Sequence, residues 1–210
     1  MEVHPPHSPI HSVKEFMIHI LAITIGLLLA LGLDSTVEWL HHRHLASEAR
    51  ENIFAEIRSN QRNVLGHLRA MPEEQKRLQV ILAAVDDLQN KRPSKPLGDF
   101  NWTFNIPAES AWNSTASSGA ITYMKYDEIR RYSQLYDFQK IYNSYAERYL
   151  QERHDMNVML TRLQAQGKLS DAEFEDGKRN IQSEIMRTLE LQEIDNDLNN
   201  AYSNILSRKN

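Results

Sequence analysis

The sequence predicts an all-α protein in which an N-terminal transmembrane helix continues into a long juxtamembrane helix and an antiparallel helical bundle. Two observations carry this prediction. The first is a stretch of 18 residues without formal charge, from Phe16 to Leu33, whose one ionisable side chain is that of His19. The second is the rest of the chain, where apolar residues recur at steps of three, four and seven, the spacing of amphipathic and coiled-coil helices.

Composition limits the class of protein. The chain has 210 residues, and the part that follows the apolar stretch, about 170 residues, is enough for one modest domain. A net charge of −4 indicates no general nucleic-acid surface, so no nucleic-acid partner is expected. The absence of cysteine excludes disulfides, thiolate zinc sites and cysteine nucleophiles.

Three interpretations compete for residues 16–33. A retained single-pass helix is favoured because the stretch spans roughly 27 Å, close to the hydrocarbon core of a bilayer. A cleaved signal peptide normally has a basic start and a shorter apolar run, although Ala30 and Gly32 form a weak cleavage pattern. A buried core helix would be apolar on one stripe only. Since Trp39 and the histidines after it suit a membrane interface, residues 13–40 are expected to form the transmembrane helix and its collar.

Small residues inside this span form one candidate binding face. Ala22, Gly26 and Ala30 repeat every four residues and share one side of the helix. Because this spacing lets two membrane helices approach closely, a homodimer through this face is expected. The alternative is that glycine and alanine are simply common in membrane helices.

Histidines form the second candidate site. Eight of the nine lie in the first 67 residues, and imidazole binds zinc, copper and nickel. His41 and His44 share a helix face, and Glu48 follows four residues later, so these three are the candidate metal ligands, particularly in a dimer. The favoured alternative is an interfacial collar that contacts lipid phosphates.

The rest of the chain is expected to follow in order. Residues 1–12 form an irregular arm, and residues 41–210 form the bundle domain. Its helices are expected over about 41–71, 73–89, 108–118, 127–166 and 171–207. Pro72 is expected to end the first of these helices and to open the second. Residues 100–106 alternate apolar and polar side chains and are expected to form an extended segment over the helices.

Local signals set several of these limits. Gly119 and Gly167 are expected to end helices, and Asp127 to cap one. Ser170 with Glu173 forms a capping box. The tyrosines between residues 132 and 149 are expected to fill the core with their hydroxyl groups at the surface, against the alternative of a ligand groove.

Two blocks of the sequence resemble a known group. The segment EFMIHILAITIGLLLALGLDSTVEWLHHRHLASEARENIFAEIRSN and the later AWNSTASSGAITYMKYDEIRRYSQLYDF resemble the two recurring blocks of uncharacterised single-span bacterial membrane proteins. The resemblance implies an architecture and no active site. It also implies a cytoplasmic N-terminus and an extracytoplasmic bundle at the inner membrane. Many members carry several lysines before the span, where this chain has Lys14 alone, and its own charges lean slightly the other way. We follow the resemblance.

The expected function is therefore that of a single-pass membrane protein whose bundle is an interaction or sensing module at the bacterial envelope. Its expected partners are the lipid bilayer, a second copy of the chain and a protein that the sequence does not identify. The alternative is a metal-binding or pH-responsive envelope protein that uses His41, His42 and His44. No enzymatic activity and no cofactor are expected, because the sequence contains no Gly-rich phosphate loop and no zinc-protease motif.

Overall fold

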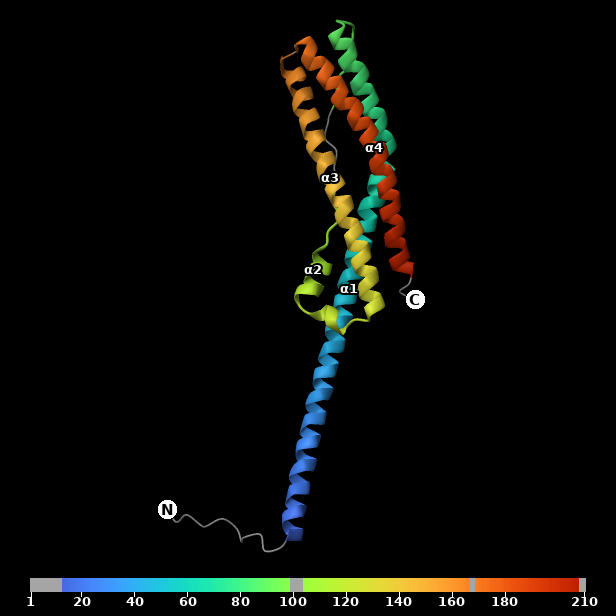
Figure 1. Ribbon diagram of the computed structural model, residues 1–210. Coiled ribbons are helices and arrows are strands. Elements are labelled where there is room, and N and C mark those ends of the chain that lie inside the picture. Colours follow the sequence, from blue (N-terminus) through green and yellow to red (C-terminus); the bar gives the residue numbers. More distant parts are fainter. Residues whose placement is uncertain (1–12, 99–103, 167–168, 208–210) are drawn as a thin grey trace, which may run out of the picture. The chain divides into compact units, whose positions relative to one another are not determined.

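The computed structural model describes residues 13–98, 104–166 and 169–207, and Figure 1 shows their arrangement. Its helices are α1 (Val13–Gln89), α2 (Ser110–Ser117), the short 3-10 helix η1 (Ala120–Tyr123), α3 (Tyr126–Gln166) and α4 (Asp171–Leu206). No strand occurs in these described ranges, so the all-α class is confirmed. The expected irregular arm, residues 1–12, lies outside them. Internal contacts divide the chain into two compact units, residues 1–48 and 49–210.

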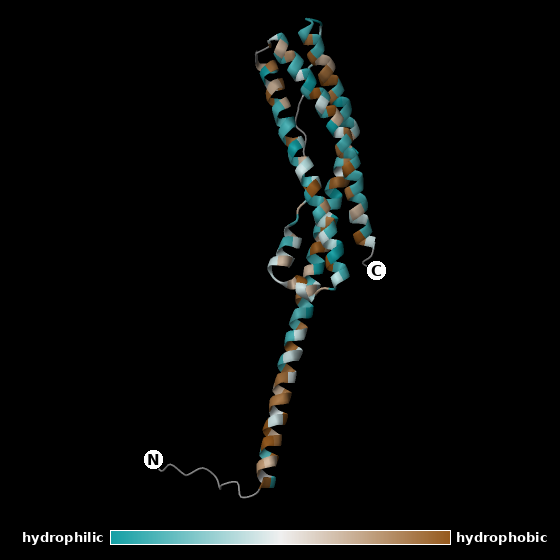
Figure 2. Ribbon diagram, viewed as in Figure 1, coloured by the Kyte–Doolittle hydropathy of each residue, from teal (hydrophilic) through white to brown (hydrophobic). Residues whose placement is uncertain are grey.

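In the first unit, α1 carries the apolar stretch. Figure 2 shows this part of α1 as mostly hydrophobic. Its most apolar 18-residue window has a mean hydropathy of 2.5, and none of the window is buried within the chain. The helix is thus long and apolar enough to cross a membrane, and the chain itself does not cover its apolar surface.

The expected helix break at Pro72 is wrong, because α1 continues through this residue to Gln89. Pro72 has no N–H group to donate to the carbonyl four residues earlier, and its ring crowds the preceding turn. Its side chain is exposed, whereas Met71 and Glu74 on either side of it are buried against the bundle. Burial on both sides of the missing hydrogen bond therefore keeps the helix continuous.

In the second unit, residues 49–89 of α1 pack with α3 and α4. The start of α1 in this unit contacts the start of α3, since Arg50 pairs with Glu128, and further along Asn60 pairs with Gln139. These two helices are therefore parallel to each other (Figure 1). Only α4 is antiparallel to both, as the bond from Tyr202 near its end to Gln139 shows.

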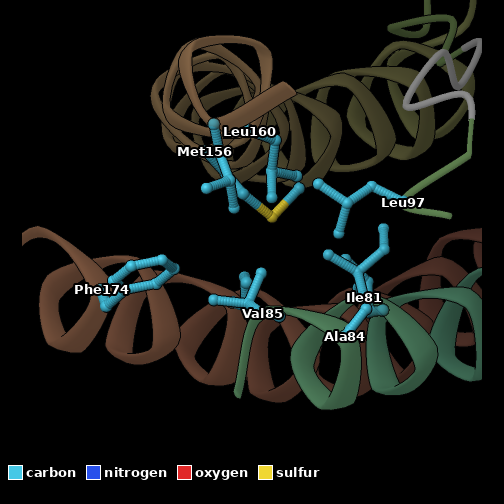
Figure 3. Packing of buried hydrophobic residues seen from close by; sticks show 10 residues of the cluster. Ile81, Ala84, Val85, Leu97, Met156, Leu160 and Phe174 are labelled. Atoms are coloured by element: carbon cyan, nitrogen blue, oxygen red, sulfur yellow. The ribbon is translucent and has the colours of Figure 1, made fainter. Parts of the chain in front are cut away.

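The bundle has an apolar core at the end where α3 meets α4. Figure 3 shows side chains of α1, α3 and α4 converging there, with Leu97, which follows α1 in the chain, among them. The cluster consists of Leu78, Ile81, Ala84, Val85, Leu97, Met156, Leu160, Leu163, Phe174 and Ile181. This end of the second unit is thus held together by ordinary hydrophobic burial.

Several local predictions are confirmed. Gly119 has φ of 76° directly after α2, a left-handed conformation that favours glycine. Ser170 and Glu173 form both hydrogen bonds of the capping box at the start of α4. Asp127 does not cap α3, which begins one residue earlier, but lies in its first turn. Gly167 and residues 100–103 of the expected extended segment lie outside the described residues, and residues 104–106 have no regular secondary structure.

Candidate functional site in the bundle core

Polar side chains occupy the middle of the second unit where apolar ones are usual. Asn60, His67 and Glu74 are buried on α1 and stand seven residues apart, so they share one face of the helix. Residues of α3 and α4 complete a layer around each of them, and we call the three layers together the polar ladder. It comprises an amide layer (Asn60, Gln139, Tyr202), a histidine layer (His67, Tyr142, Asp195) and a carboxylate layer (Glu74, Arg153, Glu184).

The amide layer joins all three long helices to Ala108, which lies shortly before α2. Gln139 accepts hydrogen bonds from the Tyr202 hydroxyl at 2.6 Å and from the Asn60 amide at 3.2 Å. Asn60 also binds both backbone groups of Ala108, donating to the carbonyl at 2.7 Å and accepting from the N–H at 3.0 Å. A buried amide that meets all these partners is satisfied, so this layer has a structural role.

The histidine layer has a defined proton arrangement. His67 Nε2 accepts from the backbone N–H of Asn105 at 3.2 Å, so in the neutral ring the proton lies on Nδ1. Nδ1 is 3.8 Å from the Asp195 carboxylate, which accepts the Tyr142 hydroxyl at 2.6 Å. The ring of Phe104 stacks on His67 with centroids 4.0 Å apart. Burial and the neighbouring Asp195 carboxylate raise the pKa of Tyr142 far above its usual range, so Tyr142 remains a neutral donor.

The carboxylate layer places two acids around one guanidinium. Arg153 contacts Glu74 at 2.5 Å and Glu184 at 3.2 Å, and the three side chains are 5 %, 3 % and 2 % exposed. Glu74 receives a second guanidinium, that of the partly exposed Arg77, at 2.5 Å. Among the described residues, Glu184 forms an ion pair with Arg153 and with no second cation. The two acids are therefore in unequal surroundings.

The surroundings of Glu184 affect its protonation. Burial, offset only in part by the charge of Arg153, raises the pKa of Glu184 to about 7. A carboxyl group with this pKa changes its charge between mildly acidic and mildly basic conditions. The chemistry of the polar ladder is thus the uptake or release of a proton at a buried position.

The predicted site residues lie elsewhere, in the first unit. The rings of His41 and His42 have centroids 6.1 Å apart, and His42 lies 3.8 Å from Glu38. Over the described ranges, no group of three histidine or carboxylate side chains is close enough to hold a metal ion. His41, His44 and Glu48 nevertheless stay a prediction, since that hypothesis includes a second copy of the chain.

The small-residue face is open within the single chain. Ala22, Gly26 and Ala30 are exposed, and a Cβ atom added to Gly26 would meet no atom within 4 Å. Dimerisation through this face also stays a prediction.

Sequence reasoning missed the polar ladder. It treated Asn60 as a gap in the apolar stripe of α1, although the buried positions continue through it at alternating steps of three and four. It also expected the tyrosine hydroxyls at the surface, whereas those of Tyr136 and Tyr142 form hydrogen bonds in the interior. The missed signal was a seven-residue repeat that is unbroken when Asn60, His67 and Glu74 are counted as core positions.

Comparison with known proteins gives no information about the site. No family model, no curated protein and no solved structure matches the chain.

Proposed function

We propose that the protein is a non-enzymatic single-pass protein of the bacterial inner membrane and that its bundle is a sensing and interaction module at the envelope. The apolar part of α1 supports the anchor, because the chain leaves this surface uncovered. The same helix contributes Asn60, His67 and Glu74 to the bundle core. The gathered ionisable groups of the polar ladder are buried, which suits a change of protonation better than contact with a substrate.

The observation that carries the sensing role is the carboxylate layer. With Glu184 protonated, the layer holds one acid, Glu74, between Arg153 and Arg77. With Glu184 ionised, a second negative charge lies in the core beside an arginine that already contacts Glu74. A buried charge without a full partner is costly, so deprotonation weakens the packing of α4 against α1 and α3. Mild acid tightens the bundle and mild base loosens it.

The direction of the pH dependence follows from the pKa. Because the pKa of Glu184 in the folded chain is about 7 instead of the usual 4.5, the folded state binds more protons between these values. The contribution to stability is full below pH 4.5 and is lost as the pH rises through 7. The difference amounts to on the order of 3 kcal/mol.

Urea unfolding of the full chain in detergent micelles between pH 4 and 8.5 tests this. Glu184→Gln should remove this pH dependence, because glutamine does not titrate. The matched control replaces His41, His42 and His44 by glutamine and should keep the wild-type slope. The reverse pattern, with the slope lost in the histidine variant and kept in Glu184→Gln, would favour the juxtamembrane histidines as the proton-responsive groups.

Reporter fusions test the placement of the bundle. We propose a cytoplasmic N-terminus and an extracytoplasmic bundle, so alkaline phosphatase fused after Asn210 should be active and a green fluorescent protein fused there should be dark. Fluorescence without phosphatase activity would place the bundle in the cytoplasm and contradict this orientation.

A further inference from the structure

A groove runs along the surface between α3 and α4 in the second unit. It has a volume of about 520 Å³. Arg130 and Arg131 of α3 and Asn204 of α4 are among its polar lining residues, and Phe138, Ala201 and Ile205 are among its apolar ones. None of its lining residues is a carboxylate. The groove therefore offers positive charge and hydrogen-bond donors beside an apolar floor.

The arginines of this groove are available to a ligand. Among the described residues, Arg130 forms one ion pair, with Asp127 at 3.3 Å, and both of these side chains are more than half exposed. Arg131 has no ion pair or hydrogen bond to the described residues. Exposed pairs such as Arg130–Asp127 contribute little, so an incoming anion can replace that contact.

Two other grooves of the second unit differ in how their positively charged side chains are paired with carboxylates. One contains Lys178, but Asp86 and Glu175 line the same groove and pair with it. The other contains Arg187, which pairs with Glu152, and it has Glu190 in its lining. Both grooves also contain Arg179, which pairs with Asp176. Each positive charge of these two grooves is thus paired with a carboxylate. In the groove between α3 and α4, Arg130 forms an exposed pair with Asp127, and Arg131 forms no ion pair with the described residues.

The groove lies at the end of the bundle where the chain enters it. Glu128, in the first turn of α3, forms two hydrogen bonds with Arg50, at 2.7 and 3.0 Å. Arg50 is the second residue of the unit that begins at Ala49. Leu40, at the end of the expected anchor, precedes Arg50 by ten positions in the sequence.

We propose that the groove between α3 and α4 binds an anionic phospholipid, with the phosphate on Arg130 and Arg131 and the first part of an acyl chain on Phe138, Ala201 and Ile205. A guanidinium group matches the geometry of a phosphate and is weakly hydrated, which favours this contact. The apolar floor would have no role in binding a free anion and favours an amphiphile. The inference rests on the membrane anchor of the proposed function and is independent of Glu184.

Native mass spectrometry of the full chain in a neutral detergent tests the site. The probes are short-chain phosphatidylglycerol, phosphatidylcholine of the same chain length, and inorganic phosphate as a competitor. Arg130→Gln with Arg131→Gln should weaken phosphatidylglycerol binding by roughly twenty-five-fold, about fivefold for each arginine. The matched control, Arg148→Gln with Arg179→Gln, removes the same charge from exposed positions outside the groove and should change the affinity less than twofold.

A second variant tests the floor without changing charge. Ala201→Phe fills part of the groove and should weaken phosphatidylglycerol binding by at least fivefold, while circular dichroism stays that of the wild type. Equal losses in the groove and control double variants would overturn the site, as would equal affinity for the two lipids. Competition by phosphate at the concentration at which the lipid binds would show a free-anion site instead of a lipid site.

The experiments distinguish an error in the proposed membrane anchor from an error in the proposed lipid site. If cell fractionation finds the chain in the soluble fraction, the anchor is wrong and the lipid assignment falls with it. If the chain is in the membrane and the lipids are not distinguished in micelles, only the groove proposal falls.

Discussion

The stability of the carboxylate layer depends on Arg153 more than on any other residue in it. This guanidinium contacts both Glu74 and Glu184 and also donates to the Tyr149 hydroxyl at 3.1 Å. Each partner is almost fully buried, so water cannot take the place of a missing cation. Removing one member of a buried ionic group is far more costly than removing an exposed ion pair.

We therefore expect Arg153→Met to reduce the free energy of unfolding by about 3–5 kcal/mol at pH 8. The loss should be smaller at pH 5, where Glu184 is protonated and only one buried carboxylate lacks the guanidinium. Urea unfolding at the two pH values measures both losses. Arg162→Met, which breaks the exposed pair with Glu173, is the control and should cost less than about 1 kcal/mol. Equal losses at pH 5 and pH 8 for Arg153→Met would contradict the assignment of Glu184 as the titrating group.

A second prediction concerns the Tyr142 hydroxyl. Tyr142→Phe removes the donor to Asp195, whose other carboxylate oxygen is buried and already without a hydrogen bond among the described residues. We expect a loss of about 1–3 kcal/mol in thermal or urea unfolding. Tyr145→Phe, three residues along the same helix and exposed, should leave stability unchanged within about 0.5 kcal/mol. A similar effect of both substitutions would show that the interior hydroxyl has no special role.

At the scale of elements, α1 is continuous despite Pro72, and this continuity has a cost. The exposed proline gives up one backbone hydrogen bond in the middle of a 77-residue helix.

Pro72→Ala should therefore stabilise the second unit, by about 1–3 kcal/mol after allowing for the greater freedom of alanine in the unfolded chain. Chemical unfolding followed by circular dichroism measures the change. Lys76→Ala, at an exposed position one turn later, is the control and should change stability by less than about 0.5 kcal/mol. A less stable Pro72→Ala variant would mean that the bundle needs the conformation that proline imposes.

The proposed dimer face also belongs to this scale. Gly26→Leu places a large side chain between two close helices and should abolish cross-linking of the chain in membranes. Gly32→Leu is a matched control on another face of the same helix, and at both positions an added Cβ meets no atom of the chain itself within 4 Å. Loss of cross-linking in both variants, or in neither, would argue against a dimer through Ala22, Gly26 and Ala30.

At the scale of the whole molecule, the sequence allows the helices to be predicted but not the way they meet. Gly119 and the pair Ser170 and Glu173 act on their neighbours along the chain, so their effects are visible locally. The parallel course of α1 and α3 is seen in contacts such as that of Arg50 with Glu128, which are 78 residues apart in the chain, and no local pattern shows it. Periodicity identifies Glu74 as a seam position once the repeat is extended, but Arg153 and Glu184 are 79 and 110 residues away.

Because sequence patterns show only neighbours along the chain, they pointed to candidate sites near the N-terminus and not to the polar ladder. Histidines and small residues near the N-terminus are conspicuous in the sequence because they are close together in it. The polar ladder combines residues from three helices, and each of them alone resembles an ordinary polar interruption of an apolar stripe. Its raised Glu184 pKa comes from burial, which is a property of the assembled bundle.

The order of the elements gives the polar ladder a further consequence during synthesis. α1 leaves the ribosome first. The residues of α1 that are buried in the folded bundle, which we call its seam, stay exposed until α3 and α4 have been made. A continuous apolar seam would expose this waiting segment to aggregation or to entry into the bilayer beside the anchor. Asn60, His67 and Glu74 interrupt the seam at every other position, so the segment from Ile57 to Leu78 contains no long apolar run. We expect the nascent chain to remain hydrated there, and to close its core only when the last helix arrives.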